Sequence, residues 1–258
     1  MRISQQDKAM RYRALLAGPA AFVTPNPWDA GSARLLAGLG FAALATSSAA
    51  AAGVLGRRDH QLSREEAMAH SRLIVEATDL PVAADLENGF GDTPEDAAET
   101  VRQAAGVGLV GCSIEDSSRH PDQPQYALDL AVARIEAAVA AARKLDFPFT
   151  LTARAENFVC GNPDLDDAIR RLKAYEKAGA DVLFAIGIPN LDAVRALCAA
   201  VEKPVNVMCG MPGHDFAVAD LEAAGVRRIS LGAALYRAAM QGARDAAIAV
   251  RDHGRLPG

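Results

Sequence analysis

The stretch PVAADLENGFGD, residues 81–92, places two carboxylates directly after a short apolar segment. Asp85 and Glu87 are two positions apart, and side chains two apart on an extended strand point to the same side. Like charges held at one place repel each other unless a cation lies between them. This spacing therefore indicates a cation site rather than a solvated loop, which is the structural alternative for the same two residues.

Polar residues recur where other apolar segments of the chain end. They are Ser47 and Ser48 in TSS, Glu115 and Asp116 in SIED, and Arg154 and Glu156 in TARAENF, with Asp59 in the loop after TSS. Oxygen ligands without nearby His or Cys favour a hard ion, so we predict Mg²⁺, with Mn²⁺ as the alternative, among the carboxylates. The planar guanidinium of Arg154 is suited to a substrate carboxylate.

Each of these residues also has a structural interpretation. Glu115 and Asp116 could begin a helix, and Asp116 points away from Glu115 in a strand. Arg154 could neutralise Glu156 in a buried ion pair. Asp59 could belong to an exposed charged loop.

The elements that position these residues alternate regularly along the chain. Apolar segments of strand length occupy eight ranges, which are 20–25, 41–47, 81–87, 109–115, 147–155, 181–187, 203–210 and 226–233, with helical periodicity between them. Continuous apolar strands joined by helices predict a parallel sheet, and eight units without a linker predict one (β/α)8 barrel over residues 1–258. An open doubly wound sheet is the rival, but no GxGxxG follows the first strand. In a barrel, the strand ends listed above meet at one rim.

Local signals support these boundaries. Ser63 and Glu66 form a capping box at a helix start, and Thr93 precedes Pro94 at a first helical position. Glycines after the helices, such as Gly108 and Gly179, are expected to turn the chain into the next strand.

Composition excludes several classes of protein. The chain has 258 residues, 50% of them hydrophobic, and a formal net charge of −5. An acidic balance argues against nucleic acid or an anionic membrane as the main partner. The first twenty residues lack the apolar core of a secretion signal and no long apolar run is present, so we expect a cytoplasmic protein. Four cysteines without CxxC spacing indicate reduced thiols rather than zinc ligands or disulfides.

Taken in order, the motifs resemble those of the isocitrate lyase/phosphoenolpyruvate mutase superfamily over nearly the whole chain. The matching segments are TSS (46–48), GRRD (56–59), ADLENGFG (84–91), SIED (113–116), TARAENF (152–158) and PVNVMCGMPG (204–213). The resemblance implies a (β/α)8 enzyme that holds a metal near Asp85, Glu87 and Glu115, partly through waters. It also implies catalytic roles for Asp59, Glu115 and Arg154.

The same resemblance implies a set of substrate contacts. Ser47, Ser48 and Ala49 would offer backbone donors to a 2-oxo acid, and Asn206 would complete this set with Arg154. Subunits that exchange helices in a tetramer are typical of the superfamily, so we expect a homo-oligomer, either a dimer or a tetramer. The exchanged part would begin near residue 234.

The segment that follows SIED sets the expected reaction. Lyases of the superfamily carry a Lys-Lys/Arg-Cys-Gly-His loop there and the mutases a Lys and an Asn-Ser pair, but this chain reads SSRHPDQPQYALD. We therefore expect neither isocitrate cleavage nor the phosphoenolpyruvate–phosphonopyruvate rearrangement. The expected reaction is metal-dependent C–C cleavage of a small 2-oxo acid such as oxaloacetate, through an enolate. The loop 117–126 should act as a lid, with Arg119 and His120 on the distal end of the substrate.

Two other functions stay open at this point. One is P–C bond chemistry on phosphonopyruvate, as a mutase or hydrolase. The other is binding of a 2-oxo acid with little turnover. His60, His120 and His214 are candidates for acid–base work, with His120 the strongest of the three, although loop histidines are more often solvent-facing.

Overall fold

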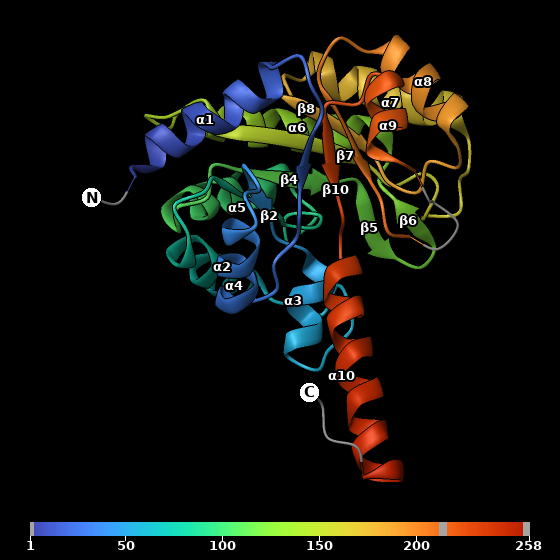
Figure 1. Ribbon diagram of the computed structural model, residues 1–258. Helices are drawn as coiled ribbons and strands as arrows, with labels where there is room; N and C mark the ends of the chain where they lie inside the picture. The colour runs from blue at the N-terminus through green and yellow to red at the C-terminus, as the bar shows by residue number, and fades with distance from the viewer. Residues whose placement is uncertain (1–2, 212–215, 255–258) are drawn as a thin grey trace.

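Eight parallel strands form a nearly closed barrel in the computed structural model, which describes residues 3–211 and 216–254 (Figure 1). The strands are β1 (Phe22–Thr24), β2 (Leu44–Ala45), β3 (Val82–Asp85), β4 (Gly111–Glu115), β7 (Thr150–Ala155), β8 (Val182–Ala185), β9 (Val205–Met208) and β10 (Arg228–Ser230). The hydrogen-bonded order is β1-β10-β9-β8-β7-β4-β3-β2. All eight predicted strands are present, and the predicted (β/α)8 fold is confirmed.

Hydrogen bonds also connect the segment after β1 with the end of β2, the two outermost strands in this order. The backbone N–H of Ala45 donates to Pro25 O at 3.2 Å, and the side-chain amide of Asn26 donates to Thr46 O at 2.8 Å. Asn26 also accepts a hydrogen bond from the backbone of Leu231 at 2.8 Å. One buried amide therefore joins β1 and the loop after β10 to the end of β2 at the rim of the barrel.

Helices surround the barrel. They are α1 (Gln5–Ala17), α2 (Ala30–Gly38), α3 (Ser48–Val54), α4 (Arg64–Ala77), α5 (Pro94–Gly106), α6 (Leu128–Ala142), α7 (Leu165–Lys177), α8 (Leu191–Ala200), α9 (Val218–Ala223) and α10 (Ala234–His253). Both predicted helix starts are confirmed, because Ser63 with Glu66 and Thr93 with Asp96 form capping boxes. Gly108, with φ 95°, makes the expected turn, and a Cβ there would lie 2.8 Å from Val75.

Helix α1 precedes the first strand, and the sequence did not predict it. Its buried Ala9, Tyr12 and Leu16 pack with Ala43 and Val182 in a cluster near the starts of the strands. Side chains from α1 therefore contribute to the packing at the amino-terminal ends of the barrel strands, opposite the rim where the strands end.

Two further elements differ from the prediction. The segment 117–126 is a two-stranded antiparallel hairpin, β5 (Ser117–His120) and β6 (Gln123–Gln125), rather than an irregular loop. Helix α3 begins directly after β2, where only a loop was expected. Both elements are short, and each lies next to the strand ends that carry the candidate site.

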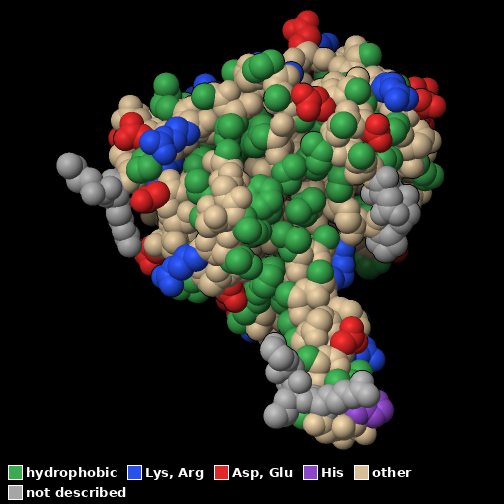
Figure 2. All heavy atoms as spheres, in the orientation of Figure 1, with side chains coloured by type: hydrophobic (Ala, Val, Ile, Leu, Met, Phe, Trp, Pro, Cys, Tyr) green, Lys and Arg blue, Asp and Glu red, His purple; other side chains and the backbone are tan. Residues whose placement is uncertain are grey.

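Helix α10 extends away from the barrel, as Figure 1 shows. None of its 20 residues is buried, although Leu235 packs partly on the core and Tyr236 contacts Trp28 edge-on at 5.9 Å between ring centroids. Hydrophobic side chains gather across the middle of the face above the base of this helix (Figure 2). Among the described residues, no helix is long and apolar enough to cross a membrane.

Candidate active site at the carboxyl ends of the strands

Arg154, near the end of β7, is the centre of an acidic cluster. Its Nη1 lies 3.4 Å from Asp85 Oδ1, its Nη2 lies 3.3 Å from Glu115 Oε2, and its Nε donates to Glu156. The guanidinium is buried and also lies over the Phe184 ring, 5.3 Å from its centroid. The barrel thus brings together four charged side chains from the ends of β3, β4 and β7.

Electrostatics in this cluster are dominated by burial. Burial raises the pKa of Glu115 well above its usual range, because desolvation of the carboxylate outweighs the attraction of Arg154. Burial raises the pKa of Glu156 for the same reason. The acids compensate the buried charge of Arg154, whose pKa lies well above its usual value despite its own desolvation.

Asp85 is held from the opposite side by the start of α3. Ser48 donates to Asp85 Oδ2 from its backbone at 3.3 Å and from its hydroxyl at 3.0 Å. Ser47 instead caps α3, because its hydroxyl accepts from the backbone of Ala50 at 3.3 Å. Ala49 follows in the first turn of α3 and is half-buried.

Glu87 lies at the site because of its backbone conformation, not because it belongs to a strand. Strand β3 ends at Asp85, and Glu87 adopts φ 51°, so the alternation argument for Asp85 and Glu87 was wrong. Its Oε2 faces His60 Nδ1 at 3.1 Å and accepts a hydrogen bond from Arg119 of the hairpin. A non-glycine residue at positive φ is uncommon and often marks a functional loop.

Asp59 lies at the exposed edge of the site, beside Glu87. Asp59, His60 and Glu87 each offer one ligand atom, and these atoms lie within 4.8 Å of one another. The hydrogen bond to Glu87 raises the pKa of His60 above its usual value. His60, which we expected to face solvent, is therefore in contact with a predicted metal ligand, and no sequence pattern separates it from an ordinary loop histidine.

The donor set fits a hard divalent cation. Glu87 Oε1 and Glu115 Oε1 are buried, and neither has a hydrogen-bond partner among the residues that the structure describes. A buried carboxylate oxygen without a partner is costly, and a bound cation would remove that cost. Asp85, Glu87 and Glu115 are thus the residues that would hold it, with Asp59 beside them.

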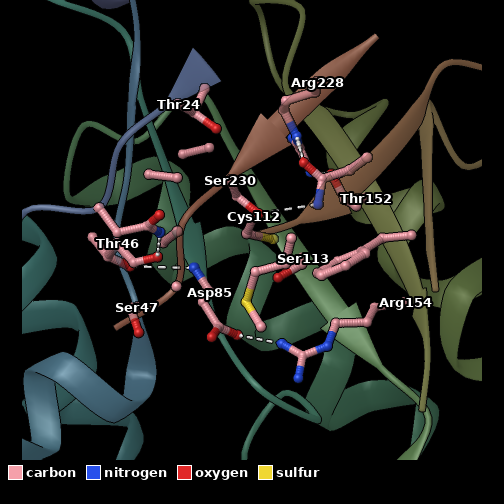
Figure 3. Close-up of a pocket in the computed structure, with 18 residues that line it drawn as sticks. Thr24, Thr46, Ser47, Asp85, Cys112, Ser113, Thr152, Arg154, Arg228 and Ser230 are labelled. Atoms are coloured by element: carbon pink, nitrogen blue, oxygen red, sulfur yellow. Dashed lines mark hydrogen bonds and ion pairs between the residues drawn. The ribbon is translucent and has the colours of Figure 1, made fainter. Parts of the chain in front are cut away.

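A cavity of about 50 Å³ opens beside this cluster (Figure 3). Its wall includes Ser47, Asp85, Arg154 and Asn206, all of which the sequence singled out. It also includes Arg228, which the sequence did not single out because charged residues inside a strand have no distinctive spacing. Two guanidinium groups therefore line one cavity, among apolar as well as polar side chains.

His120 lies away from this cavity. Its Nε2 lies 3.1 Å from Asp92 Oδ2, and both side chains are more than half exposed. Arg119, in contrast, pairs with Glu87 and packs over Phe90. Of the two predicted contacts from the hairpin, only Arg119 meets the acidic cluster. His214 lies outside the described residues, as do the last two residues of the PVNVMCGMPG motif.

Asp116, the neighbour of Glu115, has a structural role. It is buried and accepts hydrogen bonds from Gln125, Arg171, Tyr175 and the backbone of Glu156. These bonds tie the hairpin and α7 to the end of β7.

In this parallel barrel, acidic side chains surround a buried arginine at the carboxyl ends of the strands. This arrangement is that of a (β/α)8 enzyme, whose active site lies at the carboxyl ends of its strands. Residues 12–251 match the model of the phosphoenolpyruvate phosphomutase family. The chain belongs to this family, which is part of the isocitrate lyase/phosphoenolpyruvate mutase superfamily of lyases and mutases.

Relatives with several activities are similar to this chain. Probable 2-methylisocitrate lyase 2 of Corynebacterium glutamicum is 34% identical over 79% of this chain and 67% of its own length. Oxaloacetate decarboxylase of Chromohalobacter salexigens is 30% identical over 96% of this chain and 87% of its own length.

Solved structures agree with this assignment. A Burkholderia cenocepacia structure, provisionally described as a lyase/mutase, has TM-score 0.96 and 52% identity, covering 98% of this chain and 90% of its own. Oxaloacetate acetylhydrolase in complex with its product oxalate has TM-score 0.90 and 27% identity, covering 99% of this chain and 90% of its own. The superfamily and the fold are thus established, and the individual reaction is a separate question.

Proposed function

We propose that this enzyme cleaves a C–C bond in a small 2-oxo dicarboxylic acid, such as oxaloacetate, with the aid of Mg²⁺ or Mn²⁺. The observation that carries the proposal is a pair of buried oxygens, on Glu87 and Glu115, that have no hydrogen-bond partner among the described residues. They lie near a cavity that Arg154 lines. A cation site beside a carboxylate-binding guanidinium suits a chelating 2-oxo acid.

The residues of this chain divide the work by position. Arg154 binds the substrate carboxylate with its planar fork, while the backbone N–H groups of Ser47 and Ala49 donate to oxygens of the 2-oxo acid end. The backbone N–H of Ser48, which the sequence assigned to the same set, donates to Asp85 instead. Asp59 lies at the edge of the site beside the reacting centre, and Asn206 donates from the cavity wall.

When bound, the cation supplies Lewis-acid polarisation of the 2-oxo group, which stabilises the enolate that cleavage produces. In the decarboxylation of oxaloacetate, the bond between C3 and the distal carboxylate breaks. Its electron pair passes into the enolate of pyruvate, CO₂ leaves, and a proton then returns to C3. The hairpin β5–β6, tied to Glu87 through Arg119, shields this step from water.

Two observations support a dicarboxylic substrate over phosphonate chemistry. Relatives named oxaloacetate decarboxylase and oxaloacetate acetylhydrolase align over nearly the whole chain. The hairpin has neither the lysine nor the Asn-Ser pair that we expect of a mutase. P–C chemistry is the second candidate, because the matching family model is that of phosphoenolpyruvate phosphomutase.

Turnover assays decide between these functions. Purified protein should release CO₂ from oxaloacetate, or cleave a related 2-oxo diacid, faster than free Mg²⁺ does, with no activity on isocitrate. The Asp85→Ala variant should lose both this activity and Mn²⁺ binding measured by calorimetry. Efficient isomerisation of phosphonopyruvate would establish the second candidate instead. Tight oxalate binding without turnover on any substrate would indicate a 2-oxo acid binding protein.

We also propose that α10 packs on another copy of the chain in a dimer or tetramer. The barrel is otherwise surrounded by its own helices, whereas α10 leaves the barrel with no buried residue. A terminal helix that extends from its own domain can be exchanged between subunits at little cost.

A further inference from the structure

Arg228, the first residue of β10, carries a buried positive charge inside the barrel. Arg228 is 6% exposed. The three nitrogens of its guanidinium all donate to neutral groups. Nε donates to Asn206 Oδ1 at 2.8 Å, Nη1 to the Tyr12 hydroxyl at 2.7 Å and Nη2 to the Thr152 hydroxyl at 3.1 Å. No carboxylate in the described parts of the chain forms an ion pair with it.

None of the other buried arginines of the described chain combines the lack of an acid partner with a place on the cavity wall. Arg154 and Arg171 are paired with acids. Arg134 also lacks an acid, but it lies over the Tyr126 ring at 4.5 Å and does not line the cavity beside Arg154. Each nitrogen of Arg228 donates one hydrogen bond to a neutral group, yet these bonds do not neutralise its charge, and an uncompensated buried charge is destabilising.

Arg228 faces the cavity that contains Arg154 and Asp85, as Figure 3 shows. A buried positive charge attracts an anion more strongly than the same charge in solvent. We therefore expect an anion that compensates the charge of Arg228 to bind in this cavity.

Arg228 also determines how Asn206 presents its amide. A guanidinium has donors only, so the Asn206 oxygen must face Arg228 Nε. The amide nitrogen then faces Ser230 Oγ at 3.2 Å and the cavity. Asn206 is consequently held as a hydrogen-bond donor toward whatever occupies the cavity.

We propose that Arg228 is a positioning residue of the ligand site, whose charge is compensated by the bound anionic acid and which orients Asn206 to donate to that acid. The proposal rests on the proposed function only in that the ligand is a small carboxylate in this cavity. In the ligand-free enzyme, Arg228 costs stability, and in the complex it contributes to affinity.

The test uses the full-length protein and oxalate with Mn²⁺ as the probe. In Arg228→Met, we expect oxalate affinity to fall at least tenfold by calorimetry, while the ligand-free Tm stays the same or rises. Arg228→Lys, which keeps the charge, should recover part of the affinity. The control Tyr12→Phe removes a partner of Arg228 from α1 and should lower Tm while leaving oxalate affinity within twofold.

A second variant keeps the inference testable if Arg228→Met fails to fold. Asn206→Asp gives Arg228 a counter-ion and removes the amide donor, so the ligand-free Tm should rise while oxalate affinity falls. A lower ligand-free Tm in Asn206→Asp overturns this inference, as does oxalate binding within twofold of wild type in Arg228→Met. Neither result affects the proposed function. A wild-type protein that binds no oxalate overturns the proposed function together with it.

Discussion

Ser48 holds one oxygen of Asp85 with two hydrogen bonds, from its backbone N–H at 3.3 Å and from its hydroxyl at 3.0 Å. The other oxygen of Asp85 faces Arg154 Nη1 at 3.4 Å. The carboxylate is therefore held between the start of α3 and the end of β7.

Replacing Ser48 should reduce the affinity for the metal more than the stability of the fold. In Ser48→Ala, one of the two bonds to Asp85 is lost, and Mn²⁺ affinity measured by calorimetry should fall about tenfold, as for other residues that orient metal ligands. Ser47→Ala is the matched control, because its hydroxyl caps α3. That variant should lose about 1 kcal/mol of unfolding free energy and keep its Mn²⁺ affinity. Equal Mn²⁺ affinity in wild type and Ser48→Ala would argue against Asp85 as a ligand.

Arg154→Lys should weaken oxalate binding, since an ammonium cannot reproduce a two-pronged contact with a carboxylate. A charge-assisted hydrogen bond is worth about 1.5–3 kcal/mol, so a loss of affinity of about tenfold or more is expected in calorimetry. Arg171→Lys alters another buried arginine that pairs with acids, away from the cavity. It should reduce stability and leave oxalate affinity unchanged. If both variants behave alike, Arg154 serves the fold rather than the ligand.

Acid stability should depend on Asp167, in the first turn of α7. Partial burial acts to raise the pKa of Asp167, but hydrogen bonds from Arg170, Arg171 and Asn157 outweigh it and lower this pKa to about 2 from a usual 3.8. A lowered folded-state pKa stabilises the protein above pH 3.8, and this contribution is lost as the pH falls toward 2. Asp167→Asn should therefore lose about 2 kcal/mol at pH 7 and about half as much near pH 3, measured by urea unfolding.

The control for this prediction is Asp166→Asn, one position earlier on the same exposed turn. The Asp166 side chain makes no hydrogen bond or ion pair with the described residues, so its replacement should have little effect on stability at either pH. A destabilisation by Asp167→Asn that is equally large at pH 7 and pH 3 would contradict the electrostatic explanation.

Regular patterns in the sequence predicted the barrel and most of its rim. Apolar segments of strand length, the capping box at Ser63 and the glycine turns are local signals, and each appears where it was expected. Asp85, Glu115 and Arg154 were predicted together because strand ends in a parallel barrel share one rim. This argument needs only the strand boundaries, which composition marks clearly.

The remaining features depend on contacts between distant segments. Glu87 faces the site through a left-handed backbone conformation, and Arg228 meets Tyr12 across 216 positions of the chain. The hairpin 117–126 is polar apart from two prolines and Tyr126, so alternation of apolar residues could not mark its strands. Side-chain direction outside regular elements and long-range pairing are set by tertiary packing, for which one sequence carries no periodic signal.

The hairpin should control substrate binding through Arg119 rather than His120. Arg119→Ala breaks the ion pair that ties the hairpin to Glu87, so KM for oxaloacetate should rise several-fold while Mn²⁺ affinity changes less. The neighbouring His120→Ala breaks only an exposed pair with Asp92, and exposed pairs contribute about 0–1 kcal/mol. It should leave KM nearly unchanged in steady-state assays. A larger KM effect in His120→Ala would assign the substrate contact to the histidine.

Removing most of α10 should convert the proposed dimer or tetramer to a monomer. A chain that ends after Arg237 keeps the contact of Tyr236 with Trp28 and loses a helix segment with no buried residue, so the barrel should still fold. Light scattering after size-exclusion chromatography should give a dimer or tetramer for the full chain and a monomer for the shortened one. Met240→Glu, which charges a methionine that is 52% exposed on α10, should weaken the same association without shortening the chain. A full-length protein that is monomeric at micromolar concentration would show that α10 does not serve subunit exchange, and unchanged mass in both variants would assign assembly to another face.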